Sequence, residues 1–599
     1  MSADDGARGG KRRRVLHSDE VFLYEGGQIS HEIRREITRV RIGPQAIGCR
    51  AFDGCRALRK LAVPASVTKL CSYAFAGCSN LAGVQLNEGL EFVEEGSFYE
   101  CEALQQVAIP SSVIEVGDYA FHNCTNIAEL LFKEGALQVI GKSAFEECKA
   151  LQHVILPLSV TKLSKRAFKG CSGLAVVQFN VGFFTSARLW LSWFARFRRP
   201  TIGALRVIKE EAFRDCKALQ QMAIPPNVTK VGSNAFSGCG NLASVQFNEG
   251  LQIIGKGAFK YCKALQKVTI PSSVAEMGAL AFCGCINLAE VKFDEGTTLQ
   301  VIGGNAFKGC DALQQVAIPA SVTRLGNGSF KECRNLANVQ FTIPSSVTKI
   351  GESAFEECES LQQVVIPSSV TELGIYAFLR CRNLAKVHFN EGLEFIGYWA
   401  FSGCKALRSV TIPSSVSKLG NWAFDNCINL ARVQLNEGLK IIGDCAFHGC
   451  TALRSVTVPC TTTILGSQSF GHCRNLTEVT YLRGKGLLNQ RFLERGLVCG
   501  QGVLYHPEVK RMVAFRGFNA FRDSPVATIK ISISQALSER MSRLSLENLL
   551  SIEERSRDLR RLELTHDGNI LACFSYLRMG SYLFLVEDTD HQTAESLHQ

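Results

Sequence analysis

Residues 358–381, CESLQQVVIPSSVTELGIYAFLRC, contain one complete unit of a sequence repeat. Val364 and Ile366 are apolar at alternate positions, as in a β-strand, and Pro367 ends this run because it has no N–H for a strand ladder. The unit closes with Phe378 and Cys381, which we expect in a short helical or 3₁₀ segment. One such coil cannot bury its own apolar edge, so the unit predicts a fold in which successive coils stack.

The pair formed by an aromatic residue and a cysteine three positions later occurs eighteen times, from Phe52/Cys55 to Phe470/Cys473. Most successive pairs are 23 residues apart, which is a period typical of solenoids. Two types of coil alternate, one resembling residues 103–113 and the other residues 241–251. The true sequence unit is therefore a pair of coils, about 46 residues long.

The repeat reads L-x-x-V-x-I-P-x-S-V-x-x-L-G-x-x-A-F-x-x-C, and it extends over about residues 37–482. It resembles the BspA-type leucine-rich repeat, also called the Treponema-type class. The resemblance implies an α/β repeat solenoid, a right-handed leucine-rich-repeat array with a parallel β-sheet on one face. Known members of this family include surface adhesins and many intracellular proteins without an assigned role.

The repeat frame divides the chain into three regions. Residues 1–36 are expected to form a polar, partly disordered tail, residues 37–482 the repeats, and residues 483–599 a C-terminal cap or small α/β module. Within the last region, apolar residues at helical spacing predict one or two amphipathic helices in 534–563, and residues 574–586 look like a strand. The frame is lost after Leu482.

An insertion of about 22 residues interrupts the repeats at 183–204, FFTSARLWLSWFARFRRPTIGA. Trp190 and Trp193 lie in it among phenylalanines and four arginines. This composition would suit a finger that touches a membrane surface or a partner. A neutral loop insertion, or translated intron-like sequence, is the stronger explanation of the segment.

The 25 cysteines are mostly a repeat column, and we expect them to be reduced core residues rather than disulfides or zinc ligands. The N-terminus lacks the apolar segment of a signal peptide, and no apolar run is long enough to span a bilayer. These features predict a cytoplasmic or nuclear protein.

Charge and motifs argue against nucleic-acid binding and catalysis. The net charge is +11, but the basic residues are not clustered along the repeats as a nucleic-acid surface requires. The segment GLQIIGKG at 250–257 resembles a phosphate-binding loop but lacks the final Ser or Thr and belongs to the repeat frame. We therefore predict no catalytic residue, no cofactor and no metal.

The candidate binding face consists of residues that alternate with the inward positions of the strands. They form two columns of amides, threonines and a few charges. Its candidate residues are Gln106, Gln221, Gln246, Gln315, Gln340, Gln363, Lys386, His388, Arg432 and Gln434. The sequence thus favours a non-catalytic scaffold that binds an unidentified protein. The alternatives are a BspA-type cell-surface adhesin for extracellular protein or glycan, and an enzyme located in residues 484–599.

Overall fold

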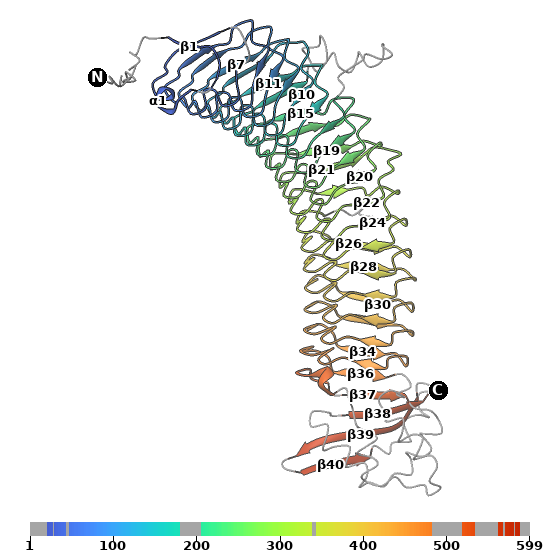
Figure 1. Cartoon of the computed structure of the whole chain (residues 1–599). Helices are drawn as coiled ribbons and strands as arrows, with labels where there is room; N and C mark the ends of the chain where they lie inside the picture. Colours follow the sequence, from blue (N-terminus) through green and yellow to red (C-terminus); the bar gives the residue numbers. More distant parts are fainter. Residues whose placement is uncertain are drawn as a thin grey trace, which may run out of the picture. The chain divides into compact units, whose positions relative to one another are not determined.

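The computed structural model describes residues 21–27, 29–43, 47–179, 205–337, 343–481, 518–526, 528–532, 561–566, 569–579 and 582–587. They belong to two compact units. The N-terminal unit is Met1–Leu288 with Asp294–Thr297, and the C-terminal unit is Ala289–Phe293 with Thr298–Gln599. Each unit is a stack of coils (Figure 1).

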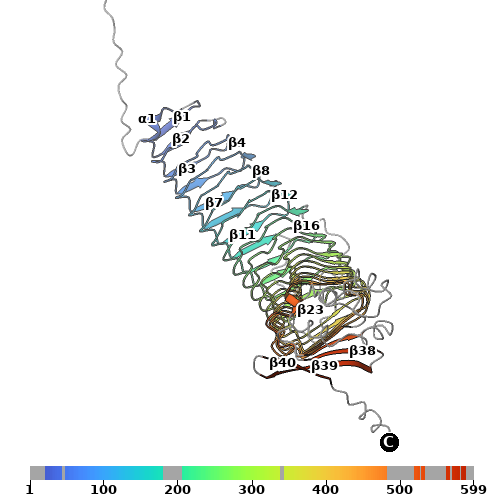
Figure 2. The ribbon, with the colours of Figure 1, turned by 90° about the horizontal axis from the view of Figure 1, so that it is seen from below.

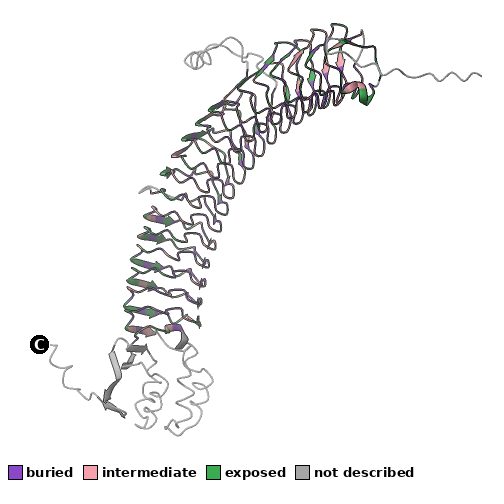
Figure 3. Cartoon of the chain, turned by 90° about the vertical axis from the view of Figure 1, so that its left-hand side faces the viewer, coloured by how far each residue is buried: buried purple, intermediate pink, exposed green. Residues whose placement is uncertain are grey.

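Most coils contribute a strand to a first parallel sheet. In the N-terminal unit the strands of the first sheet are β3 (Lys60–Ala62), β5 (Gly83–Gln85), β7 (Gln106–Ile109), β9 (Glu129–Phe132), β11 (His153–Leu156), β13 (Val176–Phe179), β15 (Gln221–Ala223), β17 (Ser244–Gln246) and β19 (Lys267–Ile270). Exposed residues alternate with buried ones along most of these strands, as in β7. Figure 3 shows exposed and buried positions along the coils.

Most coils also contribute a two-residue strand to a second parallel sheet, whereas the sequence predicted a sheet on one face only. In the N-terminal unit these strands are β4 (Lys69–Leu70), β6 (Phe92–Val93), β8 (Glu115–Val116), β10 (Val139–Ile140), β12 (Lys162–Leu163), β14 (Val207–Ile208), β16 (Lys230–Val231), β18 (Ile253–Ile254) and β20 (Glu276–Met277). The second strand forms because the chain extends again after the turn that ends the first strand, which is Pro-Ser-Ser-like in one type of coil and Asn-Glu-Gly-like in the other.

The C-terminal unit repeats this arrangement. Its counterparts of the first-sheet strands are β21 (Glu290–Phe293), β23 (Gln315–Val316), β26 (Gln363–Ile366), β28 (Lys386–Phe389), β30 (Ser409–Ile412), β32 (Arg432–Leu435), β34 (Ser455–Val458) and β36 (Glu478–Tyr481). Its second sheet contains β22 (Val301–Ile302), β24 (Arg324–Leu325), β25 (Lys349–Ile350), β27 (Glu372–Leu373), β29 (Phe395–Ile396), β31 (Lys418–Leu419), β33 (Ile441–Ile442) and β35 (Ile464–Leu465).

The third side of most coils is a run of turns rather than the predicted helical or 3₁₀ segment. The N–H of Phe378 donates to the carbonyl of Ala400 in the next coil (2.8 Å), and that of Arg380 to Ser402 (2.7 Å). Arg380 has a positive φ of 57°. Every second N–H group of this segment thus bonds to the next coil, while those between them, as at Leu379 and Cys381, bond to carbonyls three residues back (3.0 and 3.3 Å), so no continuous helix forms.

The core contains a ladder of phenylalanine rings. Within each unit, the rings of successive coils stack with centroids 4.9–5.6 Å apart and planes within 2–12° of parallel. In the N-terminal unit the ladder comprises Phe52, Phe75, Phe98, Phe121, Phe145, Phe168, Phe213, Phe236, Phe259 and Phe282. All of these rings are fully buried.

The cysteine column lies beside this ladder and consists of buried free thiols. Each thiol donates a weak hydrogen bond to the phenylalanine carbonyl of the preceding coil, as from Cys239 Sγ to Phe213 O (3.2 Å). Burial raises the pKa of the Cys55 and Cys473 thiols to about 12. These cysteines are therefore protonated packing residues at neutral pH.

The insertion does not break the stack of coils. Phe168 and Phe213 lie on either side of it in the sequence, yet their rings stack at 5.6 Å, and Leu163 pairs with Ile208 in the second sheet. Residues 183–204, including Trp190 and Trp193, lie outside the described residues. The finger hypothesis therefore stays a prediction.

An additional coil precedes the predicted start of the repeats. Strand β1 (Phe22–Tyr24) pairs in parallel with β2 (Val40–Ile42), and helix α1 (His31–Arg34) connects them (Figure 2). The Tyr24 ring lies 4.9 Å from Phe52, at the start of the core ladder. Part of the stretch expected to be a tail is thus an ordered coil.

The repeat also resumes after Leu482, contrary to expectation. The 3₁₀ helix η1 (Phe518–Phe521) brings the Phe521 ring onto Phe470 at 5.6 Å. Ser524 takes the place of the cysteine, and its hydroxyl donates to the Phe470 carbonyl (2.7 Å). Strand β37 (Thr528–Ser532) then pairs in parallel with β36.

The chain beyond this coil is described only as strands. Strand β38 (Arg561–His566) is parallel to β37, and it is followed by the antiparallel strands β39 (Asn569–Met579) and β40 (Tyr582–Glu587). The strand prediction for 574–586 is therefore confirmed. The predicted C-terminal helices are not: residues 561–563 are strand, and residues 534–560 lie outside the described residues. Among the described residues, α1 and η1 are the only helices.

Candidate interaction surfaces

The predicted binding residues lie on the outer surface of the first-sheet strands. Those with exposed side chains are Gln106, Gln221, Gln246, Gln315, Lys386, His388, Arg432 and Gln434. Gln363 is half-buried, and Gln340 lies outside the described residues. Whether these residues bind anything stays a prediction.

Register brings some of these residues together across neighbouring strands. Gln106 is opposite Glu129, and Gln363 is opposite Lys386. His388 follows two positions after Lys386 on β28, so both point outward from the same strand. The resulting surface is a mixture of amides and single charges, without a cluster of one sign.

Sequence reasoning missed exposed apolar residues on this surface, namely Val365 on β26 (39% exposed) and two residues in the N-terminal unit. Leu131 and Ile155 are 57% and 51% exposed, although both lie in strands of the repeat. The pairing of Glu129 with His153 places them opposite each other on β9 and β11, and Gln178 follows on β13. We call Leu131 and Ile155 the apolar pair. The signal was present as apolar residues at the outward positions of ELLF and HVIL.

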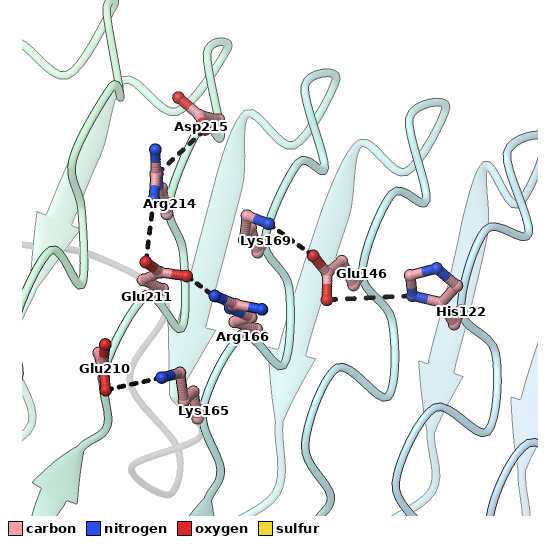
Figure 4. Close-up of polar contacts among 9 residues, drawn as sticks. All are labelled: His122, Glu146, Lys165, Arg166, Lys169, Glu210, Glu211, Arg214 and Asp215. Atoms are coloured by element: carbon pink, nitrogen blue, oxygen red, sulfur yellow. Dashed lines mark hydrogen bonds and ion pairs between the residues drawn. The ribbon is translucent and has the colours of Figure 1, made fainter.

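A charged network lies along the turns of the N-terminal unit (Figure 4). The Glu146 carboxylate, which is buried, accepts a hydrogen bond from Lys169 Nζ (2.7 Å), and its other oxygen is 3.9 Å from His122 Nδ1. Burial alone would raise the pKa of Glu146, but hydrogen bonding by Lys169 and Ser143, together with the charges of Lys169 and His122, outweighs it and holds the pKa below its usual value. Burial also lowers the pKa of His122.

A second buried carboxylate, Glu211, joins the coils on either side of the insertion. It is bound by Arg166 Nε (2.6 Å) and Arg214 Nη1 (2.9 Å), while Lys165 Nζ is 3.0 Å from Glu210 (Figure 4). Burial favours a raised pKa for Glu211, yet the two arginines hold it below its ordinary value. Both carboxylates are thus paired anions that stabilise the stack.

This network predicts a loss of stability in acid. Because the pKa values of His122, Glu146 and Glu211 are lowered in the folded chain, the unfolded chain takes up protons first. The free energy of unfolding should fall as the pH drops below 6.5, the ordinary value for histidine, and again below 4.5, that for glutamate. Urea unfolding between pH 8 and 4 measures this. Glu146→Gln should reduce the fall in the free energy of unfolding below pH 4.5, whereas Glu102→Gln, at an exposed position, should not. If both variants gave the same dependence of this free energy on pH, Glu146 would not be a source of the acid sensitivity.

An aromatic row lies along the turns of the C-terminal unit. It consists of the half-buried residues Tyr376, Trp399, Trp422, His448 and His472. Trp399 and Trp422 stack at 4.9 Å, and His448 Nδ1 is 3.0 Å from the buried Asp425 carboxylate. Because the two indole rings cover each other's faces, the row holds coils together rather than offering open faces to a ligand.

The family comparison agrees with this architecture. A model of the "BspA type Leucine rich repeat region (6 copies)" matches residues 45–175, 201–300, 300–431 and 375–491. The chain belongs to this family. BspA-type repeats therefore account for the coils of both units, and the resemblance inferred from the repeat motif is confirmed.

Solved structures similar to this chain are other leucine-rich repeat proteins. One from Bacteroides ovatus is 20% identical, with 74% of this chain and 91% of that chain covered and a TM-score of 0.39. A leucine-rich cell-surface protein from Faecalibacterium prausnitzii is 20% identical, with 73% and 90% covered and a TM-score of 0.34. The pneumococcal vaccine antigen PcpA is 18% identical, with 77% and 88% covered and a TM-score of 0.28. The comparison with curated proteins found no match.

These comparisons contradict the predicted location. The proteins found include one named as a cell-surface protein and one named as a vaccine antigen, so the prediction of a cytoplasmic or nuclear protein is wrong. Neither helix in the described part of the chain has the length or apolar character needed to cross a lipid bilayer.

Proposed function

We propose that this BspA-type repeat protein is a non-catalytic scaffold that binds a partner protein on the outer surface of its first sheet. The observation that carries the proposal is the apolar pair, Leu131 and Ile155, which leaves more than half of each side chain exposed on a regular sheet. Exposed apolar groups with a polar surround are typical of the centre of a protein interface.

The residues around the apolar pair support this surface as the binding site. Gln106, Glu129 and His153 occupy the neighbouring outward column, and they offer amide, carboxylate and imidazole groups for hydrogen bonds. Strands β7, β9 and β11 hold these groups at fixed spacing, because each strand is bonded to its neighbours on both sides. A rigid surface of this kind loses little conformational entropy when a partner binds.

The test is affinity capture with the double variant Leu131→Arg/Ile155→Arg. We expect it to lose the captured partner, because two charges would have to be desolvated at the centre of the interface. Ile286→Arg is the matched control, since Ile286 is also an exposed isoleucine (41%) but lies outside the strands. A captured set that is the same for wild type and both variants would rule out this surface.

An adhesin-like role is the second candidate, and the known adhesins of the BspA type favour it. In that case the same surface would bind extracellular protein or glycan. Binding of the purified chain to immobilised glycans, lost in the Leu131→Arg/Ile155→Arg variant and kept in Ile286→Arg, would select the glycan-binding form of this role.

A further inference from the structure

Three potential metal ligands meet in the first coils of the N-terminal unit. The potential ligand atoms are two thiol Sγ atoms and one carboxylate oxygen, which come from Cys49, Cys71 and Glu94. These three atoms lie within 4.8 Å of one another. Cys49 is exposed, while Cys71 and Glu94 are half-buried, so solvent reaches the group. It is the one group of three such ligands found in the described residues.

The second sheet explains why residues so far apart in sequence meet here. Ile47 bridges to Leu70, and Leu70 pairs with Val93. Cys71 and Glu94 directly follow β4 and β6, and Cys49 lies two residues after the bridge at Ile47. Because parallel strands end at the same edge of a sheet, the three side chains leave the backbone at one place.

We propose that Cys49, Cys71 and Glu94 form a binding site for a thiophilic divalent cation, with Zn²⁺ as the best fit. Two thiolates and a carboxylate are ordinary zinc ligands, with bonds of about 2.3 Å to sulfur and about 2.0–2.2 Å to oxygen. A tetrahedral ion with these bonds needs its ligand atoms roughly 3.5–3.8 Å apart. The three ligand atoms already lie within 4.8 Å of one another, so side-chain rotations bring them to this spacing. A water molecule would take the fourth position.

Neighbouring groups orient the carboxylate. Glu94 Oε2 accepts hydrogen bonds from the main-chain N–H of Ser72 (3.1 Å) and from its hydroxyl (3.4 Å). Lys69 Nζ lies 2.6 Å from Glu94 Oε1. Two thiolates, one carboxylate and Zn²⁺ carry a net charge of −1, which the Lys69 ammonium neutralises. The surroundings thus balance the charge of the loaded site and hold one ligand in place.

Later coils of the N-terminal unit show why the site is confined to this end. The position four residues before the core phenylalanine, held by Cys71 and Glu94 in the second and third coils of the Phe/Cys frame, becomes glycine in most later coils. An added Cβ at each of these glycines would lie 2.4–2.8 Å from the main chain of the preceding coil. The glycines at this position in the N-terminal unit are Gly117, Gly141, Gly232, Gly255 and Gly278. The exceptions in this unit are Ser164 and Lys209, which are not ordinary zinc ligands, so ligand side chains occupy this position only in the first coils.

The test is a titration of the full-length chain with Co²⁺ as a spectroscopic substitute for Zn²⁺, under a non-thiol reductant. We expect one equivalent to produce the visible absorption of four-coordinate cobalt and a thiolate-to-cobalt charge-transfer band, and one equivalent of Zn²⁺ to displace it. Cys49→Ser and Cys71→Ser should each lose the charge-transfer intensity of one thiolate, and their double variant should lose all of it.

Two further variants distinguish a built site from incidental thiol binding. Cys460→Ser is the control, because Cys460 is also exposed and its Sγ donates to the Glu437 carboxylate (3.1 Å), yet it belongs to no group of three potential metal ligands in the described part of the chain. It should bind as the wild type does. Ser72→Ala should weaken binding about 10-fold, as expected when a group that orients a ligand is removed.

Two results would overturn the proposal. One is a wild-type chain that shows no thiolate–cobalt band, or a Cys49→Ser/Cys71→Ser variant that keeps the band. The other is a Cys49–Cys71 disulfide that persists under the reductant, which would identify the two cysteines as a structural disulfide cross-link. Neither result bears on partner binding at the apolar pair, because the two surfaces share no residue.

Discussion

Replacement of Phe168 by alanine should lower the free energy of unfolding by about 3–5 kcal/mol. The Phe168 ring is fully buried and stacks on Phe145 at 5.3 Å and on Phe213 at 5.6 Å. Its removal leaves a cavity that the neighbouring coils cannot fill, because each is held by main-chain hydrogen bonds to the next. Urea unfolding followed by circular dichroism measures the change.

Phe92→Ala is the matched control for this substitution. Phe92 is half-buried on the second sheet, outside the ladder, so the same truncation should cost less than half as much. A Phe168→Ala chain as stable as the Phe92→Ala chain would show that the ladder across the insertion does not form.

The sequence predicted the strands and the core because both follow from local periodicity. The alternation of Val364 and Ile366 places their side chains inside, and the structure buries both. The turn after them could not be predicted in the same way. Phe378 bonds to the carbonyl of the next coil, and a single repeat read alone does not contain that partner.

The C-terminal coil shows how a motif that is too strict misses an element. A search for phenylalanine followed by cysteine ends at Phe470, whereas the structure continues with Phe521 and Ser524. The Ser524 hydroxyl donates to a phenylalanine carbonyl as the cysteine thiols do, with a better donor. A pattern that allowed serine at this position would have found the coil.

The candidate sites differ in how far sequence could reach them. The outward columns with Gln106 and Lys386 follow from the period of two, so their exposure was predictable. The apolar pair was missed because an apolar residue in a strand was assumed to face inward. The group of Cys49, Cys71 and Glu94 depends on contacts between three coils, and these become visible only when the register is known.

Gly141→Ala should be the other strongly destabilising single substitution, at about 2–3 kcal/mol. A Cβ at Gly141 would lie 2.4 Å from the carbonyl carbon of Gly117 and 2.5 Å from the N atom of Asp118. Both are main-chain atoms that cannot rotate away, so the two coils must separate locally. Since Gly141 bonds to Val116 through its N–H (2.7 Å), separation also lengthens a main-chain hydrogen bond. Hydrogen exchange at the Gly141 amide should therefore accelerate in the variant.

Gly83→Ala is the control that separates close packing from a general intolerance of glycine replacement. Gly83 lies in β5, and no heavy atom is within 4 Å of an added Cβ. The alanine there restricts only the unfolded chain, so the free energy of unfolding should rise by about 0.4–1 kcal/mol. A fall in the free energy of unfolding for Gly141→Ala and a rise for Gly83→Ala would establish that backbone contact at glycines such as Gly141 sets the spacing between coils. Equal effects at Gly83 and Gly141 would contradict it, and with it the explanation for why this position is glycine in most later coils.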